Sequence, residues 1–183
     1  MSNAQHGRAW IRVLLGAALL VLLWFAANWG IHAYVSSRIE AHNGQPVPQF
    51  SLRDQAGRVW TTADLRQGKT TVLNFFRSAC SGCLKEREAV FALHQSADQS
   101  RLQVLGVMLD QVQGFSAETT QRTLARFAYR HPVLMADRAF VDAFHGVGWA
   151  HVTPVTYVVD GTGRIVRALR GHQTLAALQA AVR

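Results

Sequence analysis

The stretch that decides the fold is residues 71–83, TVLNFFRSACSGC. It begins with an apolar run that has the composition of a buried strand, and it ends with Cys80 and Cys83. The residues that follow, up to about Ser96, have the composition of a helix. Cys80 and Cys83 are the only two cysteines in the 183-residue chain, so a single CxxC pair lies at a strand-to-helix junction. That context is typical of a redox-active cysteine pair.

The position of the pair at a helix start predicts its chemistry. Unpaired backbone N–H groups and the positive end of the helix dipole both favour a thiolate over a thiol. In CxxC motifs the thiol pKa falls from about 8.5 to between about 3.5 and 7.5. We therefore expect Cys80, at the mouth of the helix, to be the exposed nucleophile. Cys83 lies one turn further in, so we expect it to be more buried and to act as the resolving thiol.

Other uses of a cysteine pair fit the sequence less well. A structural disulfide and half of a zinc site are the alternatives. A tetrahedral zinc site needs about four ligands, and the chain has no second CxxC and no nearby HxxxH. A haem attachment site needs CxxCH, whereas Leu84 follows Cys83.

Length and composition predict one folded domain with appendages. The chain is 49% hydrophobic and 16% charged, and its nine Phe and five Trp are enough for a real core. The formal net charge is +8, but the basic residues are spread along the chain and no Lys/Arg-rich run or nucleic-acid motif is present. We therefore expect no nucleic-acid partner. The positive charge favours anionic lipid or acidic partners.

The N-terminal segment predicts a membrane anchor. Residues 13–37 contain no Asp, Glu, Lys or Arg, and about 20 apolar residues are enough to cross a bilayer. We predict a short cytoplasmic tail at 1–12 and a transmembrane helix at 13–35. Arg8 and Arg12 favour a cytoplasmic N-terminus, which places the rest of the chain in the periplasm. A cleaved signal peptide, with an apolar region of about 7–15 residues, and a buried soluble helix are the alternatives.

The remainder predicts a linker and a folded domain. Residues 36–48 are polar and contain Pro46 and Pro48, which favour an extended linker. Residues 49–183 form the domain, with a helical turn at 62–65. Strands are expected at 50–52, 58–60, 69–76, 102–109, 132–135, 155–159 and 164–169. Helices are expected at 84–96, 116–129, 137–144, where Asp137 caps the helix, and 173–182. Strands that alternate with helices and end in a hairpin predict an α/β fold with a mixed central sheet.

The order of strand, CxxC, helix and a later Thr-Pro before a hairpin resembles the thioredoxin fold. The closest resemblance is to the membrane-anchored TlpA-like family of thiol–disulfide oxidoreductases, and within it to DsbE-like and ScsD-like proteins. It is carried by residues 50–57 (FSLRDQAG), by 72–76 with 80–83, and by 152–163 (VTPVTYVVDGTG). The resemblance frames residues 46–183. It implies a thioredoxin-like fold, with a central mixed β-sheet flanked by helices, preceded by an N-terminal transmembrane helix.

The resemblance also implies further site residues. Pro154 matches the family's cis-proline, which places Thr153 beside the CxxC pair, where its backbone can pair with an extended client peptide. Glu86 matches a glutamate that TlpA-like proteins often carry, and it is a candidate for handling the proton of the resolving thiol. Asn74 stands where thioredoxins proper have a buried aspartate. The alternatives are an ordinary strand-opening proline for Pro154 and a solvated helix charge for Glu86.

Two departures from the family pattern leave the client and the reduction potential open. Ala79 stands where the family often has a Trp, and Glu88 stands where it often has a proline. The first change opens the surface beside Cys80, and the second removes a helix kink. The Ser81–Gly82 pair also lacks the proline of thioredoxins, and the intervening residues tune the potential.

These features predict a membrane-anchored periplasmic thiol–disulfide oxidoreductase that acts on protein thiols and disulfides and sits in the inner membrane. No cofactor is needed, and a redox partner protein must supply or accept electrons. The alternative function is a copper-binding or copper-delivery module that uses the same cysteines, aided by a histidine such as His151. His131, His145 and His172 are expected to be surface or core residues. A peroxidase lacks support, because the usual threonine-containing approach to the reactive cysteine is absent.

Overall fold

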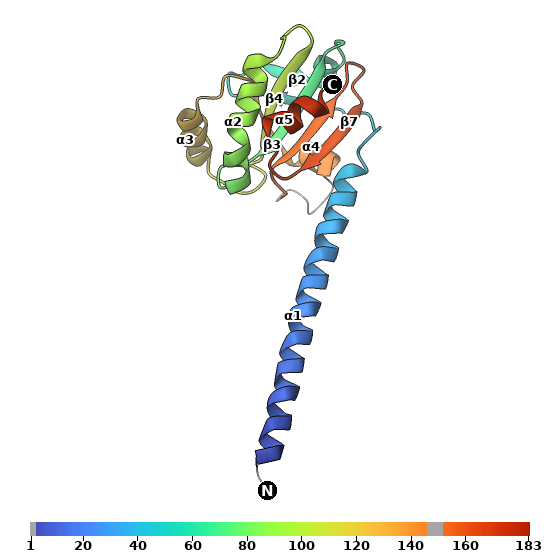
Figure 1. Cartoon of the computed structure of the whole chain (residues 1–183). Coiled ribbons are helices and arrows are strands. Elements are labelled where there is room, and N and C mark those ends of the chain that lie inside the picture. The colour runs from blue at the N-terminus through green and yellow to red at the C-terminus, as the bar shows by residue number, and fades with distance from the viewer. Residues whose placement is uncertain (1–2, 146–151) are drawn as a thin grey trace. The chain divides into compact units, whose positions relative to one another are not determined.

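The structure, a computed structural model, describes residues 3–145 and 152–183 and divides into two units, one ending at Arg38 and one of residues 39–183. The first unit contains all but the last two residues of helix α1 (Asn3–Glu40), drawn in blue in Figure 1. Within it, Trp10–Glu40 is the one helix among the described residues that is long and apolar enough to cross a membrane. Its large apolar side chains, such as Leu20 and Trp24, are exposed. The helix is therefore a candidate membrane span, as the sequence predicts.

The second unit is built around a five-stranded mixed sheet with the order β5-β4-β3-β6-β7. Its strands are β3 (Thr70–Phe76), β4 (Leu102–Met108), β5 (Val133–Met135), β6 (Val155–Val159) and β7 (Ile165–Arg170). The central strand β3 pairs in parallel with β4 and antiparallel with β6. A separate antiparallel pair is formed by β1 (Ser51–Arg53) and β2 (Val59–Thr61), and the 3-10 turn η1 (Thr62–Leu65) follows it. An apolar strand such as β3 suits the middle of a sheet that is covered on both faces.

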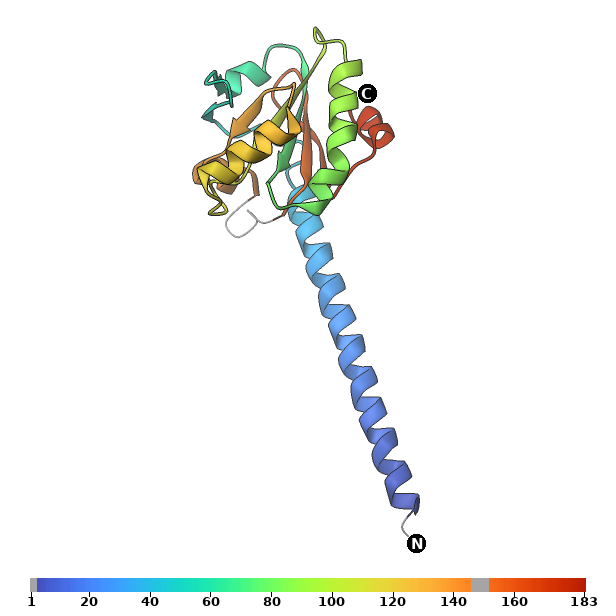
Figure 2. The same cartoon turned by 90° about the vertical axis from the view of Figure 1, so that its left-hand side faces the viewer.

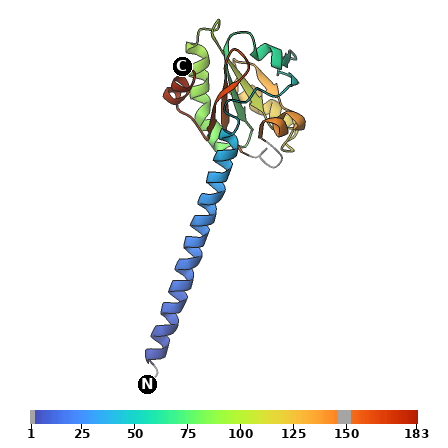
Figure 3. The same ribbon diagram turned by 90° about the vertical axis from the view of Figure 1, so that its right-hand side faces the viewer.

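Helices cover both faces of this sheet (Figures 2 and 3). They are α2 (Ser81–Ser96), α3 (Ala117–Phe127), α4 (Arg138–His145) and α5 (Leu175–Ala181). On one face Val72 of β3 packs with Val90 of α2 and Leu178 of α5. On the other face Phe75 of β3 packs its ring against Phe140 and Phe144 of α4. Val72 and Phe75 are an odd number of residues apart on β3, so they point to opposite faces of the sheet, as the two-residue period of a strand requires.

Local chemistry sets where several of the helices begin and end. Asp137 caps α4, since its Oδ1 accepts a hydrogen bond of 2.8 Å from the backbone N–H of Phe140. Ser116 caps α3 through a hydrogen bond of 3.2 Å from the N–H of Thr119. Helix α3 stops at Ala128, which adopts a left-handed conformation with φ of 45°. The predicted α/β fold with a mixed central sheet is confirmed.

The segment predicted as a linker differs from the structure. Helix α1 continues to Glu40, and the extended chain after it pairs with the edge of the sheet. The N–H of Gly44 donates to the carbonyl of Ile165 at 2.7 Å, and the N–H of Val47 donates to the carbonyl of Gly163 at 2.9 Å. Val47 is only 2% exposed. This segment therefore packs on the folded unit, because it satisfies backbone groups and buries an apolar side chain there.

Candidate active site

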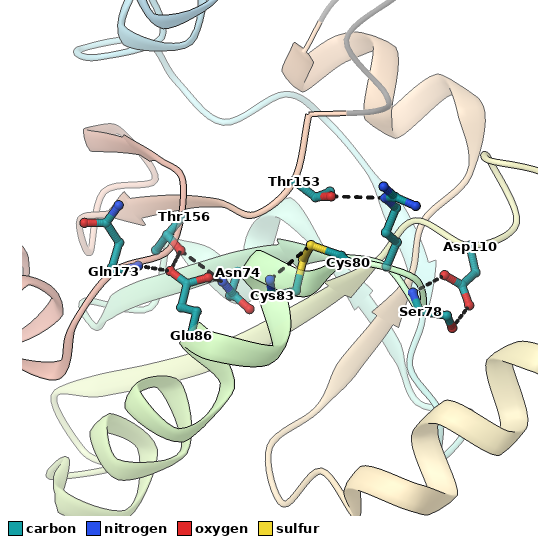
Figure 4. The surroundings of a disulfide bond; sticks show 10 residues. Asn74, Ser78, Cys80, Cys83, Glu86, Asp110, Thr153, Thr156 and Gln173 are labelled. Carbon is teal, nitrogen blue, oxygen red and sulfur yellow. Dashed lines mark hydrogen bonds between the residues drawn. A yellow bond between two sulfur atoms is a disulfide. The ribbon is translucent and has the colours of Figure 1, made fainter.

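The two cysteines form a disulfide bond at the first turn of α2, with their Cα atoms 5.2 Å apart (Figure 4). Cys80 is the N-cap residue of the helix, and its Sγ accepts a hydrogen bond of 3.0 Å from the backbone N–H of Cys83. A negative charge on this sulfur after reduction would face the free N–H groups and the positive end of the helix dipole. The geometry therefore favours a Cys80 thiolate.

The predicted difference in exposure between the two cysteines is wrong for the oxidised chain. Cys80 is 6% exposed and Cys83 is 9% exposed, so the first cysteine is not the more open one. Both belong to an apolar cluster with Phe76, Met108 and Val133. Because the capping position turns the sulfur of Cys80 back toward the helix, this residue packs against the ends of β3 and β4 rather than pointing into solvent.

Pro154 packs directly against the CxxC turn. A Cβ atom placed on Gly82 would lie 3.0 Å from Cδ of Pro154, which is tighter than nearly all real contacts of a Cβ. The peptide bond between Thr153 and Pro154 is cis, as the family resemblance implies. Pro154 is buried, and its carbonyl accepts from the N–H of Gly171 at 2.9 Å. The structure thus brings the distal Thr-Pro and the CxxC pair together.

Thr153 lies at the rim of the site and is partly exposed. Its hydroxyl accepts a hydrogen bond of 3.3 Å from Nε of Arg77, in the loop that leads to Cys80. That is the only hydrogen bond of Thr153 among the contacts of the described residues.

Glu86 is buried beside the pair, with an exposed fraction of 1%. Its Oε2 accepts from Nδ2 of Asn74 at 2.8 Å, and its Oε1 accepts from the hydroxyl of Thr156 at 3.3 Å and from the N–H of Gln173 at 3.2 Å. Burial raises the pKa of this carboxyl, and the three hydrogen bonds oppose that shift without cancelling it. The alternative of a solvated helix charge is therefore wrong.

Asn74 links Glu86 to the central sheet. Its amide donates both to Glu86 and, at 3.0 Å, to the hydroxyl of Thr156. Asn74 lies on β3 and Thr156 on β6, directly opposite each other in the antiparallel register. The amide of Asn74 and the hydroxyl of Thr156 do not ionise near neutral pH. Glu86 is therefore the one of these three side chains that gains or loses a proton.

A second buried carboxylate, Asp110, was not expected from the sequence. It has no exposed surface, and its Oδ1 accepts from the N–H of Ser78 at 2.8 Å. Its Oδ2 accepts from the hydroxyl of Ser78 and, at 2.9 Å, from that of Thr120. In Figure 4 Glu86 and Asp110 lie on opposite sides of the disulfide. The sequence did contain a signal for Asp110, because this acidic residue directly follows the apolar run at 102–109. It therefore lies at the end of a strand, on the edge of the sheet where α2 begins.

The histidines divide between core and surface. His131 is 1% exposed and lies 5.6 Å from His94 between ring centroids. Burial and the neighbouring His94 lower the pKa of His131 to about 4, so it is neutral at physiological pH. His172 is exposed. His151 lies outside the described residues, and the side chain of His145 lies outside the part described in detail.

The copper alternative gains no further ligand from this arrangement. Among the described residues, no group of three or more His, Cys, Asp or Glu side chains could hold a metal ion. Within the same ranges, the two cysteines have each other as partners.

The family model that describes the AhpC/TSA family matches residues 43–168, which run from β1 into β7 and include both cysteines, Glu86 and Pro154. The chain belongs to the AhpC/TSA family. The thiol:disulfide interchange protein HelX of Rhodobacter capsulatus is 33% identical over 137 residues, covering 72% of this chain and 69% of HelX. The thiol-disulfide oxidoreductase ResA of Geobacillus thermodenitrificans is 25% identical over 164 residues, covering 89% of this chain and 90% of ResA.

Solved structures agree on the fold. The thioredoxin domain of a thiol-disulfide oxidoreductase from Bacteroides vulgatus matches with a TM-score of 0.63 at 20% identity, covering 77% of this chain and 98% of that one. StoA of Bacillus subtilis matches with a TM-score of 0.63 at 14% identity, covering 75% and 98%. The predicted membership of a thioredoxin-like family and the predicted enzyme class, a thiol–disulfide oxidoreductase with a CxxC pair, are confirmed.

Proposed function

We propose that this member of the AhpC/TSA family is a membrane-anchored oxidoreductase that exchanges disulfides with protein clients in the periplasm. The observation that carries the proposal is the Cys80–Cys83 disulfide at the start of α2, packed against Pro154. The names of HelX and ResA support the reaction class. The exposed apolar surface of α1 supports the anchor, and Arg8 and Arg12 support a cytoplasmic N-terminus.

The reaction proceeds by two exchanges. In the reducing direction, the Cys80 thiolate attacks one sulfur of a client disulfide, and a client thiolate leaves. The Cys83 thiolate then attacks the sulfur of Cys80, re-forms the Cys80–Cys83 bond and releases the second client thiolate. Two electrons pass from the pair to the client, and a redox partner protein must reduce the pair again. The oxidising direction runs the same steps in reverse.

Glu86 is proposed as the group that accepts the proton of Cys83 before the second exchange. It lies on α2 one turn after Cys83, and its raised pKa makes it a stronger base than an ordinary glutamate. Asn74, Thr156 and the N–H of Gln173 hold the carboxylate in place. Glu86 therefore serves the resolving step rather than the attack by Cys80.

Thr153 and Pro154 are proposed to bind the client. The backbone N–H and carbonyl of Thr153 can pair with an extended client segment, as in the addition of a strand to a sheet. Packing of Pro154 on Gly82 fixes that backbone beside the pair. This contact orients the client sulfur for in-line attack.

The test is the reduction of insulin disulfides by the pre-reduced full-length chain in a non-ionic detergent. We expect turnover with dithiothreitol as the electron source, and loss of turnover in Cys80→Ser. Cys83→Ser should instead accumulate a mixed disulfide with the client, visible on a non-reducing gel. Turnover by Cys80→Ser at the wild-type rate would overturn the proposal.

A further inference from the structure

A pocket of about 340 Å³ lies beside the redox pair, on the side of α3. Its lining comes from the loop before Cys80, the first turn of α2 and one face of α3. Its lining includes Ser78, Leu84, Arg122, Thr123, Arg126 and Phe127. Ser78 and Leu84 bracket the CxxC motif in the sequence. The pocket, called the α3 pocket, therefore lies beside the CxxC turn, and its lining contains neither cysteine.

The α3 pocket is fixed relative to the disulfide. The hydroxyl of Ser78 lies 2.7 Å from that of Thr123 on α3, within hydrogen-bond distance. Asp110 joins the same loop to the helix, since it accepts from both Ser78 and Thr120. Leu124 of α3 packs on the apolar cluster that contains both cysteines. A ligand bound on this face of α3 is thus held at a set distance from Cys80.

The charge of the α3 pocket is positive. Arg122 and Arg126 are four residues apart on α3, so both lie on the same face, and none of the described residues that line the pocket is a carboxylate. Arg122 has one ion pair, at 3.8 Å with Glu118, and the two side chains are 70% and 79% exposed. Such an exposed pair is weak and can exchange partners. Arg87 also lies near the pocket, with its guanidinium 4.6 Å from the ring centroid of Phe127, and it is ion-paired with the exposed Glu88.

The α3 pocket also has an apolar part. Leu84, the residue after Cys83, is 47% exposed although it is a large apolar side chain. Phe127 lines the same pocket at the far end of α3. An apolar floor with a cationic rim matches a peptide that carries both an apolar side chain and carboxylates.

We propose that the α3 pocket binds an acidic segment next to the reacting cysteine of the client or redox partner. This inference rests on the proposed function and specifies its partner. Aspartate or glutamate side chains pair with Arg122 and Arg126, an apolar side chain contacts Leu84 and Phe127, and the neighbouring sulfur reaches Cys80. The exchange itself is unchanged: the dithiol of Cys80 and Cys83 becomes a disulfide, and the disulfide of the peptide becomes a dithiol.

The test uses the full-length chain in a non-ionic detergent, reduced beforehand with dithiothreitol and freed of it. Three peptides of equal length each contain one internal disulfide, flanked by Asp/Glu, by Ser/Gln or by Lys. The measured quantity is the rate of single-turnover reduction of each peptide, divided by the rate for the Ser/Gln peptide. Electrostatic steering changes association rates by about 10- to 1,000-fold. We expect the acidic peptide to react roughly tenfold or more faster than the basic one at low salt. At about 1 M salt, where the Debye length is about 3 Å, the rates should converge.

Two variants locate the effect. Arg122→Glu with Arg126→Glu should reverse the order of the acidic and basic peptides, and the pair of Gln substitutions should abolish the difference. Arg167→Glu with Arg183→Glu changes the net charge equally at the opposite end of β3, near Thr70, and should keep the wild-type order and rates. If the wild type reduces all three peptides at equal rates, or if both α3 variants still prefer the acidic peptide, the inference about the α3 pocket is wrong and the proposed function is unaffected. If the wild type reduces none of the peptides, the proposed function fails with it.

Discussion

The side-chain amide of Asn74 donates a hydrogen bond of 2.8 Å to Oε2 of Glu86, and this contact joins β3 to α2 beneath the redox pair. An aspartate at position 74 would place two carboxylates side by side in a buried site. With an amide there, one acid remains, and it receives hydrogen bonds from three groups. Its raised pKa comes from burial, which penalises the charged form more than the donors favour it.

Replacing Glu86 with Gln should slow the resolving step. The substitution keeps the size of the side chain and removes the base, so a mixed disulfide between Cys80 and a client should accumulate. Alkylation of reduced Cys80 by iodoacetamide should change little, because the start of α2 stabilises that thiolate. Quenched-flow gels across pH 6 to 8 measure both reactions. The control is Glu88→Gln, which removes an exposed acid on the same helix and should resolve normally. Wild-type resolution in Glu86→Gln would assign the proton transfer to another group.

The same residue should make folding stability depend on pH. A raised pKa means that the folded chain holds the proton on Glu86 more tightly than the unfolded chain. The stability from this group is complete below the unfolded pKa of about 4.3 and is lost as pH rises through the raised native value. Wild type should therefore lose stability relative to Glu86→Gln between pH 4 and pH 8. Urea unfolding of the oxidised full-length chain in detergent gives the difference, and a difference that is constant with pH would contradict the raised pKa.

Pro154 should matter more to client turnover than to the fold. Its ring packs on Gly82, and Pro154→Ala removes the contact that sets the backbone of Thr153 beside the pair. A misplacement of about 1 Å can cost roughly a hundredfold in rate, so a loss of between ten- and a hundredfold in insulin reduction is expected. Circular dichroism should show the same secondary structure as the wild type. Pro46→Ala, in the segment that pairs with β7, is the matched control and should retain turnover. Equal turnover in Pro154→Ala would show a merely structural proline.

Asp110 should contribute to the stability of the redox loop. Asp110→Ala leaves the N–H of Ser78 without its acceptor, while the hydroxyls of Ser78 and Thr120 each lose one of two hydrogen-bond partners. A fully buried polar group without a partner costs about 1–3 kcal/mol, and these half-buried groups should cost less because water reaches them. Asp110→Asn retains one carbonyl oxygen and should cost less. Urea unfolding measures both variants, with the exposed Asp98→Ala as the control. If Asp98→Ala and Asp110→Ala destabilise the chain equally, the network around Ser78 contributes nothing specific.

The sequence predicted those parts of the site that follow from local order along the chain. The apolar run before Cys80 predicted the central strand, and Asp137 predicted the start of α4. The resemblance to a known family identified Glu86 and Pro154 as site residues. The burial of Glu86 and the packing of Pro154 on Gly82 could not be predicted from the sequence alone. These properties depend on the tertiary packing of segments far apart in the sequence.

The parts that the sequence missed depend on the meeting of strand ends. Asp110 contacts Ser78 because β3 and β4 are parallel and end at the same edge, which brings together residues 32 positions apart. The burial of Cys80 depends on side chains from β3, β4 and β5 that converge on it. The α3 pocket needs the face of α3 to be placed beside α2, and local periodicity alone does not give that placement.

Helix α1 should anchor the chain in the membrane. The full-length chain should stay in the membrane fraction after carbonate extraction, because α1 exposes a long run of large apolar side chains between Val13 and Tyr34. Leu20→Arg with Leu22→Arg puts two charges near the middle of this helix, and each costs about 2.5–3.5 kcal/mol on insertion scales. That variant should move largely to the soluble fraction, whereas Leu20→Ala with Leu22→Ala should remain bound. Recovery of a wild-type soluble form that begins between residues 28 and 40 would instead indicate a cleaved signal peptide.

A protease added to spheroplasts should digest the domain of the anchored chain, and protection of that domain would place it on the cytoplasmic side.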